Sequence, residues 1–352
     1  MVNHQFQKNQ VHRKGVLAKP LVLIISPALA KANNGNWQTA ARWSRFLRDS
    51  YTVVCAASDT SLRATLQPDV LIALHARRSA DALLEFEQRC PSILVLTGTD
   101  LYRDIRTDLA AQHSLAIATR LVVLQAAGMD ELPPPLLEKT CVIHQSARTL
   151  KAINRHRAAL KVIMIGHLRA EKDPATFLRA CMHLEHDDID FMHVGGALDA
   201  SMEVQATSMA DRNPRYRWIG NQPHAATRQR LKHSDLMVIS SIMEGGANVI
   251  TEAITSGVAV VASDISGNRG LLGDDYAGYF PVGDASALST LIRRCASEPL
   301  FLAHLQAQCD LRRPLFTPER ECAAVRQLVD NCLHIHGQAL RYPSIPATQG
   351  FP

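Results

Sequence analysis

Short uninterrupted apolar runs, separated by segments of helical periodicity, constrain the fold of this chain more than any other feature. In the first half the runs are Leu21–Ile25, Thr52–Ala56, Val70–Leu74, Ile93–Leu96 and Leu121–Leu124. Runs such as LVLII do not alternate polar with apolar residues, so other elements must cover both faces of each strand. We therefore predict β-α-β units and a mainly parallel, doubly wound sheet.

The same pattern starts again after a proline-rich break at residues 131–136 and a basic stretch, RTLKAINRHR, at residues 148–157. The apolar runs of the second half are residues 161–166, 191–196, 217–220, 236–240, 258–263 and 278–282, and a helical stretch follows from about 288 to 340. We expect an α/β protein with two Rossmann-like doubly wound domains that face a central cleft. Ligands should bind there, at the C-terminal ends of the strands.

These patterns divide the chain into four parts. Residues 1–19 are polar and basic and are expected to form a flexible extension without a signal peptide. Residues 20–150 should form the first domain and residues 151–315 the second. Residues 316–352 should form a C-terminal helix and tail, for which a return to the first domain is one option.

Composition narrows the range of partners. The formal net charge of +5 is small and dispersed, which favours small anionic ligands and argues against nucleic acid. The eight cysteines include no C-x-x-C pair and are expected to be reduced thiols of a cytoplasmic protein. No run reaches the ~18 apolar residues that a membrane span requires, so no membrane association is expected.

The first chemical motif is GHLRAEKDPATFLRA, which begins at Gly166 directly after a predicted strand. Arg169 and Lys172 stand three residues apart in the loop, and Asp173 and Pro174 are typical of the N-cap and first position of a helix. Two cations beside a helix N-terminus form a site for a diphosphate. A solvated loop with an incidental R-x-x-K spacing is the alternative.

The second motif is SIMEGGANVITEAITSGVAVVAS, residues 241–263. A strand leads into a Gly-Gly loop, a helix begins near Ala247, and Glu244 and Glu252 stand eight residues apart, so both can face one ligand. Carboxylates accept hydrogen bonds from sugar or ribose hydroxyls, and the N–H groups of residues 245–248 could meet a phosphate. The alternative is a pair of surface glutamates on an amphipathic helix.

The first half carries its own candidates. The stretch NNGNWQTAARW, residues 33–43, places a short loop before a helix and is interpreted as an anion cradle, with an ordinary tight turn as the alternative. Polar and basic residues also follow two other predicted strands. The candidates for binding a second, anionic ligand in the cleft are Asn33, Asn36, His75, Arg77, Arg78, Thr97, Gly98, Thr99, Asp100 and Arg103. As alternatives, His75 is a core histidine, Arg77 and Arg78 are a solvated pair, and Asp100 caps a helix.

The second half, over residues 160–285, resembles the donor domain of family 4 glycosyltransferases of the GT-B fold, whose marks are a G-R-L-x-x-x-K loop and an E-x7-E motif. The resemblance implies that Lys172, helped by Arg169, holds the donor diphosphate, that Glu252 binds the ribose, and that Glu244 binds the sugar. The implied set of nucleotide-sugar contacts is Asn34, Gly35, Asn36, Gly166, His167, Arg169, Lys172, Gly220, Asn221, Gly245, Gly246, Ala247, Asn248 and Glu252. The sequence departs from the family at EGGAN, where the family has E-x-F-G, and at His167, where the family has arginine.

The first half, through ISPALAKANNGNWQTAARW, LHARRS and LTGTDLYRDI, combined with GHLRAEKDP and MEGGANVITEA, resembles the selenosugar synthases of selenoneine-type biosynthesis. That resemblance implies a UDP-sugar donor, with N-acetylglucosamine as the sugar, and selenophosphate as the acceptor, which the ten candidates of the first half would bind. The product would carry a carbon–selenium bond at the anomeric carbon. Other enzymes of the same selenium pathway would be its partners.

The expected mechanism needs no metal, because no D-x-D-like clamp is present and the cations can stabilise the leaving diphosphate. The catalytic candidates are Arg169, Lys172, Glu244 and His75. Three rival functions remain open at this point: an ordinary family 4 glycosyltransferase with a hydroxyl acceptor, a non-catalytic nucleotide-sugar-binding protein, and a sugar-nucleotide epimerase.

Overall fold

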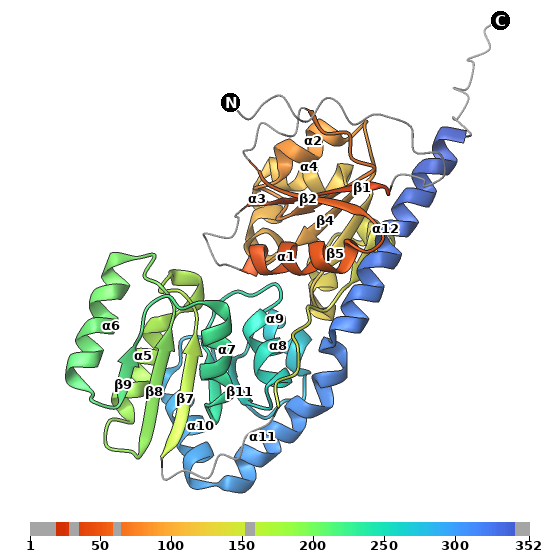
Figure 1. The fold of residues 1–352 in the computed structure, drawn as a ribbon. Helices are drawn as coiled ribbons and strands as arrows, with labels where there is room; N and C mark the ends of the chain where they lie inside the picture. The colour runs from red at the N-terminus through yellow and green to blue at the C-terminus, as the bar shows by residue number, and fades with distance from the viewer. Residues whose placement is uncertain (1–18, 28–34, 59–64, 152–158, 342–352) are drawn as a thin grey trace, which may run out of the picture.

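The chain forms two α/β domains, each built on a six-stranded parallel sheet (Figure 1). This computed structural model describes residues 19–27, 35–58, 65–151 and 159–341, with the backbone alone for residues 335–341. The predicted fold class, α/β with two Rossmann-like doubly wound domains, is confirmed. No helix in the described ranges has the length and apolar character needed to span a bilayer.

The N-terminal sheet has the strand order β2-β1-β3-β4-β5-β6. Its strands are β1 (Leu21–Ser26), β2 (Thr52–Ala57), β3 (Val70–Leu74), β4 (Ser92–Leu96), β5 (Arg120–Val123) and β6 (Thr140–Val142). Its helices and helical turns are α1 (Gly35–Leu47), α2 (Ala80–Phe86), η3 (Asp100–Asp104), α3 (Ile105–Thr107), α4 (Leu109–Ile117), η4 (Ala126–Glu131) and η5 (Pro134–Lys139). All five predicted strands are confirmed. The short edge strand β6 was not predicted, because its three half-buried residues carry no apolar run.

Strand β1 shows why its sequence is apolar at successive positions. Val22 and Ile24 pack on one face of the sheet in a cluster with Trp43 of α1, whereas Leu23 and Ile25 belong to a second cluster on the opposite face. All four side chains are fully buried. Helices therefore cover both faces of this parallel sheet.

The C-terminal sheet has the strand order β12-β11-β10-β7-β8-β9. Its strands are β7 (Leu160–Ile165), β8 (Ile189–Val194), β9 (Tyr216–Trp218), β10 (Leu236–Ile239), β11 (Ala259–Ser263) and β12 (Tyr279–Phe280). Its helices and helical turns are η6 (Ala170–Lys172), α5 (Pro174–His183), α6 (Ala200–Arg212), α7 (His224–Lys232), α8 (Asn248–Thr255), α9 (Ser266–Leu272), α10 (Ala285–Ser297), α11 (Pro299–Arg312) and η7 (Arg313–Phe316). Each of the six predicted runs overlaps one of these strands.

Strand order reverses once in each sheet, and the two reversals determine where ligands can bind. In the N-terminal sheet the reversal lies between β1 and β3, and in the C-terminal sheet it lies between β7 and β10. A crevice forms at the carboxyl ends of the strands at such a point, because the two connecting chains leave on opposite faces. Predicted functional loops follow the four strands at these reversals, β1, β3, β7 and β10, and further predicted site residues follow β4 and β9.

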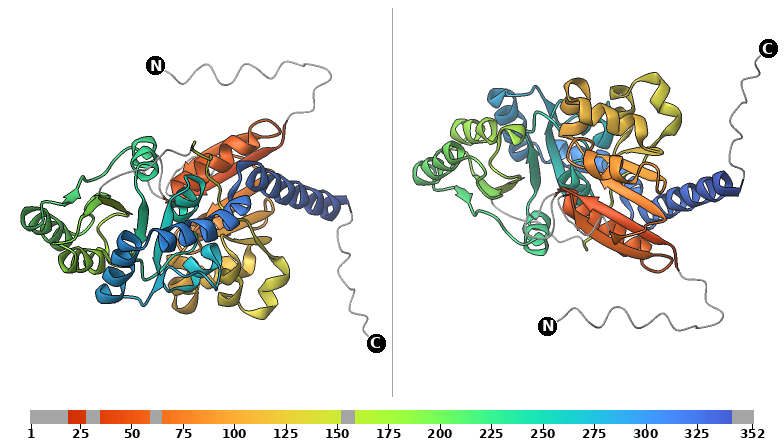
Figure 2. Two further views of the ribbon diagram at one scale, coloured as in Figure 1. Left: turned by 90° about the horizontal axis from the view of Figure 1, so that it is seen from below. Right: turned by 90° about the horizontal axis from the view of Figure 1, so that it is seen from above.

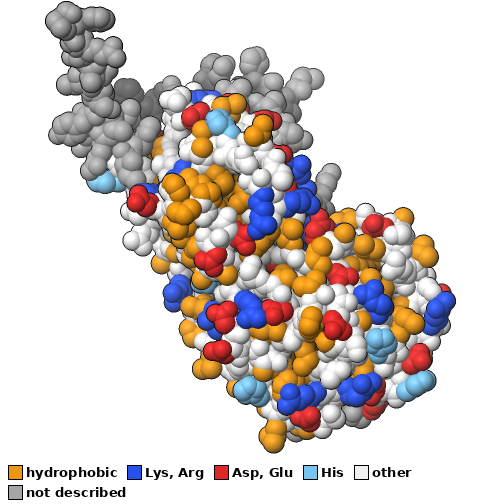
Figure 3. All heavy atoms as spheres, turned by 180° about the vertical axis from the view of Figure 1, so that it is seen from behind, with side chains coloured by type: hydrophobic (Ala, Val, Ile, Leu, Met, Phe, Trp, Pro, Cys, Tyr) orange, Lys and Arg blue, Asp and Glu red, His pale blue; other side chains and the backbone are white. Residues whose placement is uncertain are grey.

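The helical stretch predicted near the C-terminus is divided into α10, α11 and α12 (Pro318–Arg341), because Pro299 and Pro318 each begin a new helix. Figures 1 and 2 show α12 running back along the N-terminal domain. Val325 and Val329 of α12 are buried in the same cluster as Trp43. On the face drawn in Figure 3, basic and acidic side chains are interspersed over the surface.

A buried carboxylate fastens α12 to the N-terminal domain. Glu321 is 2% exposed and accepts hydrogen bonds from Arg42 Nε and Trp43 Nε1, each at 2.7 Å. It also accepts from the backbone N–H of Ser146, at 2.8 Å, and from its hydroxyl, at 2.5 Å. Because Ser146 belongs to the connection between the two domains, Glu321 joins α1, α12 and that connection.

We predict that Glu321→Gln lowers the free energy of unfolding by about 3 kcal/mol or more, because Arg42 loses its buried counter-charge and one of the four donors loses its acceptor. Urea denaturation followed by tryptophan fluorescence measures the change. Glu319→Gln, an exposed position two residues earlier on α12, is the matched control and should change stability little. Equal stability of the two variants would contradict the role given to Glu321.

Candidate active site

The loop after β7 holds the first predicted cations. Gly166 lies directly after the strand, and a Cβ atom there would contact the Lys172 side chain at 3.5 Å. Asp173 is the N-cap of α5, accepting from Thr176 N at 3.2 Å, and Pro174 is its first residue, which confirms both predictions. The Arg169 side chain is 42% exposed, with its Nε 4.0 Å from Glu171 Oε2.

Lys172 and Glu244 come from the two predicted motifs and form an ion pair. Their side chains are only 17% and 9% exposed. Ser241, which was not predicted, donates its hydroxyl to the same carboxylate oxygen at 2.6 Å. The structure therefore brings the R-x-x-K loop and the first glutamate of the E-x7-E motif together beside the reversal point of the sheet.

Helix α8 begins where the sequence predicts, with Ala247 as N-cap and Asn248 as its first residue. Glu252 lies in its second turn and is 8% exposed. The Glu252 carboxylate pairs with His224 Nε2 of α7 at 2.7 Å, a partner that spacing alone could not reveal. The two glutamates share the same edge of the sheet, but each has a different basic partner.

Two histidines shape the loop after β7. His167 Nδ1 accepts from Gly196 N at 3.0 Å, and burial, helped by Arg169 and Lys172, lowers the pKa of this imidazole. His193 lies beneath the loop, with Nε2 3.2 Å from the Gly166 carbonyl oxygen, and burial lowers its pKa to about 4. Both rings are therefore neutral near pH 7, and the proton of His193 Nε2 is donated to Gly166.

The last two predicted nucleotide contacts lie after β9. Gly220 has φ +64°, a left-handed conformation that favours glycine, and a Cβ atom there would meet no neighbour within 4 Å. Asn221 is exposed, and its side chain comes within 3.4 Å of the position a Cβ would take on Gly196. This segment therefore borders the loop that carries His167.

On the N-terminal side, Asp100 organises the loop after β4. Its carboxylate is fully buried and accepts from the backbone N–H groups of Thr97, at 2.9 Å, Gly98, at 2.8 Å, and Ala76, at 2.9 Å. Asp100 is the first residue of the helical turn η3, whose N-cap is Thr99, so its carboxylate closes the loop and does not cap the helix. The prediction that Asp100 contacts the acceptor needs correction, because these amides enclose its oxygens.

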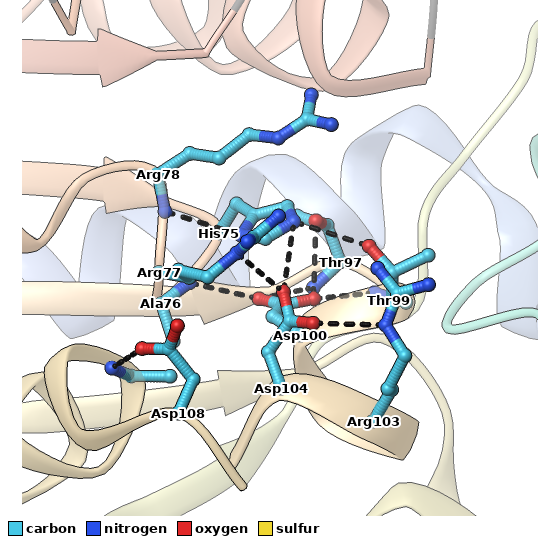
Figure 4. Close-up of polar contacts among 12 residues, drawn as sticks. His75, Ala76, Arg77, Arg78, Thr97, Thr99, Asp100, Arg103, Asp104 and Asp108 are labelled. Carbon is cyan, nitrogen blue, oxygen red and sulfur yellow. Dashed lines mark hydrogen bonds and ion pairs between the residues drawn. The ribbon is translucent and has the colours of Figure 1, made fainter.

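His75 follows β3 in a left-handed conformation, with φ +75°. The ring is 3% exposed, its Nε2 lies 3.1 Å from Thr99 Oγ1 and 3.9 Å from Asp104 Oδ2, and burial lowers its pKa. Figure 4 shows Arg77 and Arg103 converging on Asp104, whereas the Arg78 side chain extends away from that carboxylate. Asp104 was not predicted, because nothing in its spacing distinguishes it from other helix-turn carboxylates.

Loops of the two domains contact each other directly at this site. A Cβ atom on Gly245 would lie 2.5 Å from Gly98 N, and one on Gly246 would lie 2.5 Å from the Leu124 Cβ. Farther along the same boundary, a Cβ on Gly35, the first residue of α1, would lie 3.5 Å from Asn248 Nδ2. The small residues of EGGAN thus leave room for the N-terminal domain, where an aromatic residue would collide.

The structure describes only the second half of the predicted anion cradle, Gly35 and Asn36. Gly35 and Asn36 lie in the first turn of α1 and not in a loop before it. Asn33 and Asn34 lie outside the described residues. The N-terminus of α1 nevertheless faces that of α8 across the domain boundary, so two helix N-termini meet at the site.

Comparison with known families decides what kind of domain carries the two motifs. Residues 147–309 match the family described as Glycosyl transferases group 1. This domain is therefore similar to the group 1 glycosyltransferases. The prediction of a glycosyltransferase is confirmed at the level of the family. Over 145 residues the chain is also 26% identical to the amylovoran biosynthesis glycosyltransferase AmsK of Erwinia amylovora, a match that spans 38% of this chain and 35% of that relative.

Solved structures extend the likeness of this glycosyltransferase to both domains. HepE of Anabaena, solved with UDP and glucose, aligns with a TM-score of 0.71 at 15% identity, over 89% of this chain and 100% of that one. A sucrose-phosphate synthase of Thermosynechococcus elongatus aligns with a TM-score of 0.75 at 15% identity, over 90% and 100% of the two chains. At this identity the likeness establishes the GT-B fold. No group of three or more potential metal ligands occurs in the described part of the glycosyltransferase.

We predict that Gly245→Ala opens the boundary between the domains, because the new methyl group would lie 2.5 Å from backbone atoms of residues 97 and 98. Small-angle X-ray scattering should report a larger radius of gyration. Gly35→Ala is the matched control at the same boundary, where a Cβ meets only a side chain at ordinary distance. An unchanged radius of gyration for Gly245→Ala would contradict the direct contact.

We predict that His193 makes stability depend on pH. Its pKa falls from 6.5 in the unfolded chain to about 4 in the folded one, so between these values the unfolded chain binds a proton that the folded chain does not. This group therefore removes about 3 kcal/mol of stability as the pH falls from 6.5 to 4. Urea denaturation across this range should show a shallower slope for His193→Gln, whereas the exposed-histidine control His113→Gln should leave the slope unchanged.

Proposed function

We propose that this glycosyltransferase transfers a sugar, N-acetylglucosamine, from UDP to selenophosphate and forms a carbon–selenium bond at the anomeric carbon. The donor half is supported by the family of the C-terminal domain and by the UDP bound in the HepE structure. The acceptor half is supported by the resemblance of the first half to selenosugar synthases. It is also supported by the close contact between the two domains, which favours a small acceptor.

Lys172 and the N-terminus of α8 support the donor site. Both lie at the carboxyl edge of the sheet, beside the reversal point between β7 and β10. A cation and a set of helix N–H groups stabilise the negative charge that develops on a departing diphosphate. Glu252, eight residues beyond Glu244, is placed to accept ribose hydroxyl hydrogen bonds once His224 turns aside.

The contact between Gly98 and Gly245 is the observation that carries the acceptor proposal. It joins the loop after β4 to the loop after β10 at backbone distance, so the domains close on one side of the site. A closed boundary suits a small anion better than a lipid or a saccharide chain. Arg77 and Arg103, both partly exposed beside this boundary, supply positive charge for such an anion.

The reaction proceeds without a strong general base. The bond between the anomeric carbon and the β-phosphate oxygen breaks, the electron pair leaves with UDP, and a lone pair of selenium forms the new bond to carbon. Selenophosphate is already anionic, so no proton has to be removed before the attack. Water then cleaves the selenium–phosphorus bond and releases phosphate, which completes the selenosugar.

One observation favours a second candidate function, transfer to a hydroxyl acceptor. His75 is neutral near pH 7, because burial lowers its pKa, and it lies 3.9 Å from Asp104. A neutral imidazole beside a carboxylate can accept a proton from an attacking hydroxyl. His75 would then be essential for this reaction but not for transfer to selenophosphate.

The deciding experiment measures UDP release from UDP-N-acetylglucosamine with and without selenophosphate, together with the mass of the product. The proposal expects release that depends on selenophosphate and a sugar product with the isotope pattern of selenium. Release that is unaffected by selenophosphate but stimulated by a hydroxyl compound would support the second candidate. UDP binding without any release would indicate a non-catalytic binding protein.

We predict that Lys172→Met lowers kcat/KM for the donor by about 100- to 1,000-fold, because the cation beside the leaving diphosphate is lost. Lys139→Met is the matched control, since Lys139 is a half-buried lysine of η5 whose bonds are to the carbonyls of Ala116 and Ala118. This control should retain kcat/KM even if its melting temperature falls. Equal loss in both variants would assign the effect to stability.

A further inference from the structure

A buried carboxylate that the sequence did not identify organises the acceptor side of the site. We propose that Asp104 is a positioning residue, which holds Arg77 and Arg103 as the two arms of a clamp for a tetrahedral oxyanion of the phosphate type. The inference rests on the proposed function, since it states how the acceptor is held. Because it concerns ligand binding, it can be tested without measuring turnover.

Asp104 is buried, whereas the two arginines that contact it are exposed. Its carboxylate is 5% exposed, with Oδ1 3.0 Å from Arg103 Nε and Oδ2 3.1 Å from Arg77 Nε. The two arginine side chains are 50% and 43% exposed. Asp104 thus lies inside the domain, and the arginines it anchors extend to the surface of the site (Figure 4).

Each arginine uses its Nε on Asp104, so the terminal nitrogens remain for other partners, and Arg103 Nη1 has one in Glu171. A guanidinium presents five N–H donors in a planar fork that matches the oxygens of a phosphate. Within the described ranges, Asp104 is the only carboxylate in ion-pair contact with Arg77. Both arginines are therefore anchored through Nε, and the terminal nitrogens of Arg77 are available to a ligand.

Asp104 and Glu171 together balance the charges of Arg77 and Arg103. An oxyanion that displaced Glu171 from Arg103 would therefore meet two guanidinium groups at the domain boundary. The cation of Arg103 is partly compensated by Glu171, whose Oε1 lies 3.7 Å from Arg103 Nη1. That carboxylate belongs to the other domain, so it occupies the side from which an anionic ligand would approach.

The position of Glu171 also locates the clamp relative to the donor. Glu171 directly precedes Lys172 in η6, the turn that supplies the donor cation. Arg103 therefore reaches from the N-terminal domain to the loop that holds the donor diphosphate. An oxyanion bound by Arg77 and Arg103 would lie beside the donor site, where an attack on the sugar requires it.

The test titrates inorganic phosphate into the protein while saturating UDP fills the donor site. Arg77→Gln and Asp104→Asn should each weaken phosphate binding about tenfold, and Arg77→Lys should restore only part of the loss, because a lysine lacks the planar fork. The Kd of UDP should stay within twofold of the wild-type value in every variant. Arg106→Gln is the matched control, an arginine two residues beyond Asp104 that pairs with Glu131 at 2.5 Å.

The outcomes of this binding test distinguish a failure of the arginine clamp from a failure of the proposed reaction. Weakened phosphate binding with unchanged UDP binding supports the clamp, even if selenophosphate proves not to be the acceptor. No detectable phosphate binding by the wild-type protein, or unchanged binding in Arg77→Gln, overturns it. If Asp104→Asn does not fold, Arg77→Gln and Arg77→Lys decide the matter, because Arg77 is exposed and its replacement leaves the core intact. Equal loss in Arg106→Gln overturns it as well.

Discussion

The close backbone contact between residues 97–98 and Gly245 is the constraint on which the site depends. Only glycine at positions 98, 245 and 246 allows loops from the two domains to approach this closely. The contact brings the carboxyl edges of two parallel sheets together, and with them the residues that follow each strand. The loop after β4 and the loop after β10, from different domains, therefore become parts of one site.

Charge is distributed in the same way on both sides of this contact. Each domain holds a mostly buried carboxylate that fixes basic groups: Glu244 pairs with Lys172 in the C-terminal domain, and Asp104 pairs with Arg77 and Arg103 in the N-terminal domain. Such groups are held before any ligand arrives, so little reorganisation is needed when a charged substrate binds. The ion pair between Arg103 and Glu171 connects the two sets across the boundary.

The sequence predicted the fold well, because apolar runs buried on both faces occur in few other architectures. It also predicted the start of α8 and the cap of α5, where local signals such as Asp-Pro act over one turn. It could not predict His224 beside Glu252 or Asp104 between two arginines, since these pairs depend on how separate helices pack. Asp100 misled the prediction, because a carboxylate that closes its own loop resembles one that awaits a ligand.

A crystal structure of the protein with UDP tests the central claim most directly, namely that the donor site lies where β7 and β10 reverse the strand order. The account predicts that the diphosphate contacts Lys172 and the first N–H groups of α8, and that the ribose hydroxyls take the place of His224 on Glu252. A diphosphate bound elsewhere, with Lys172 still paired only to Glu244, would contradict it.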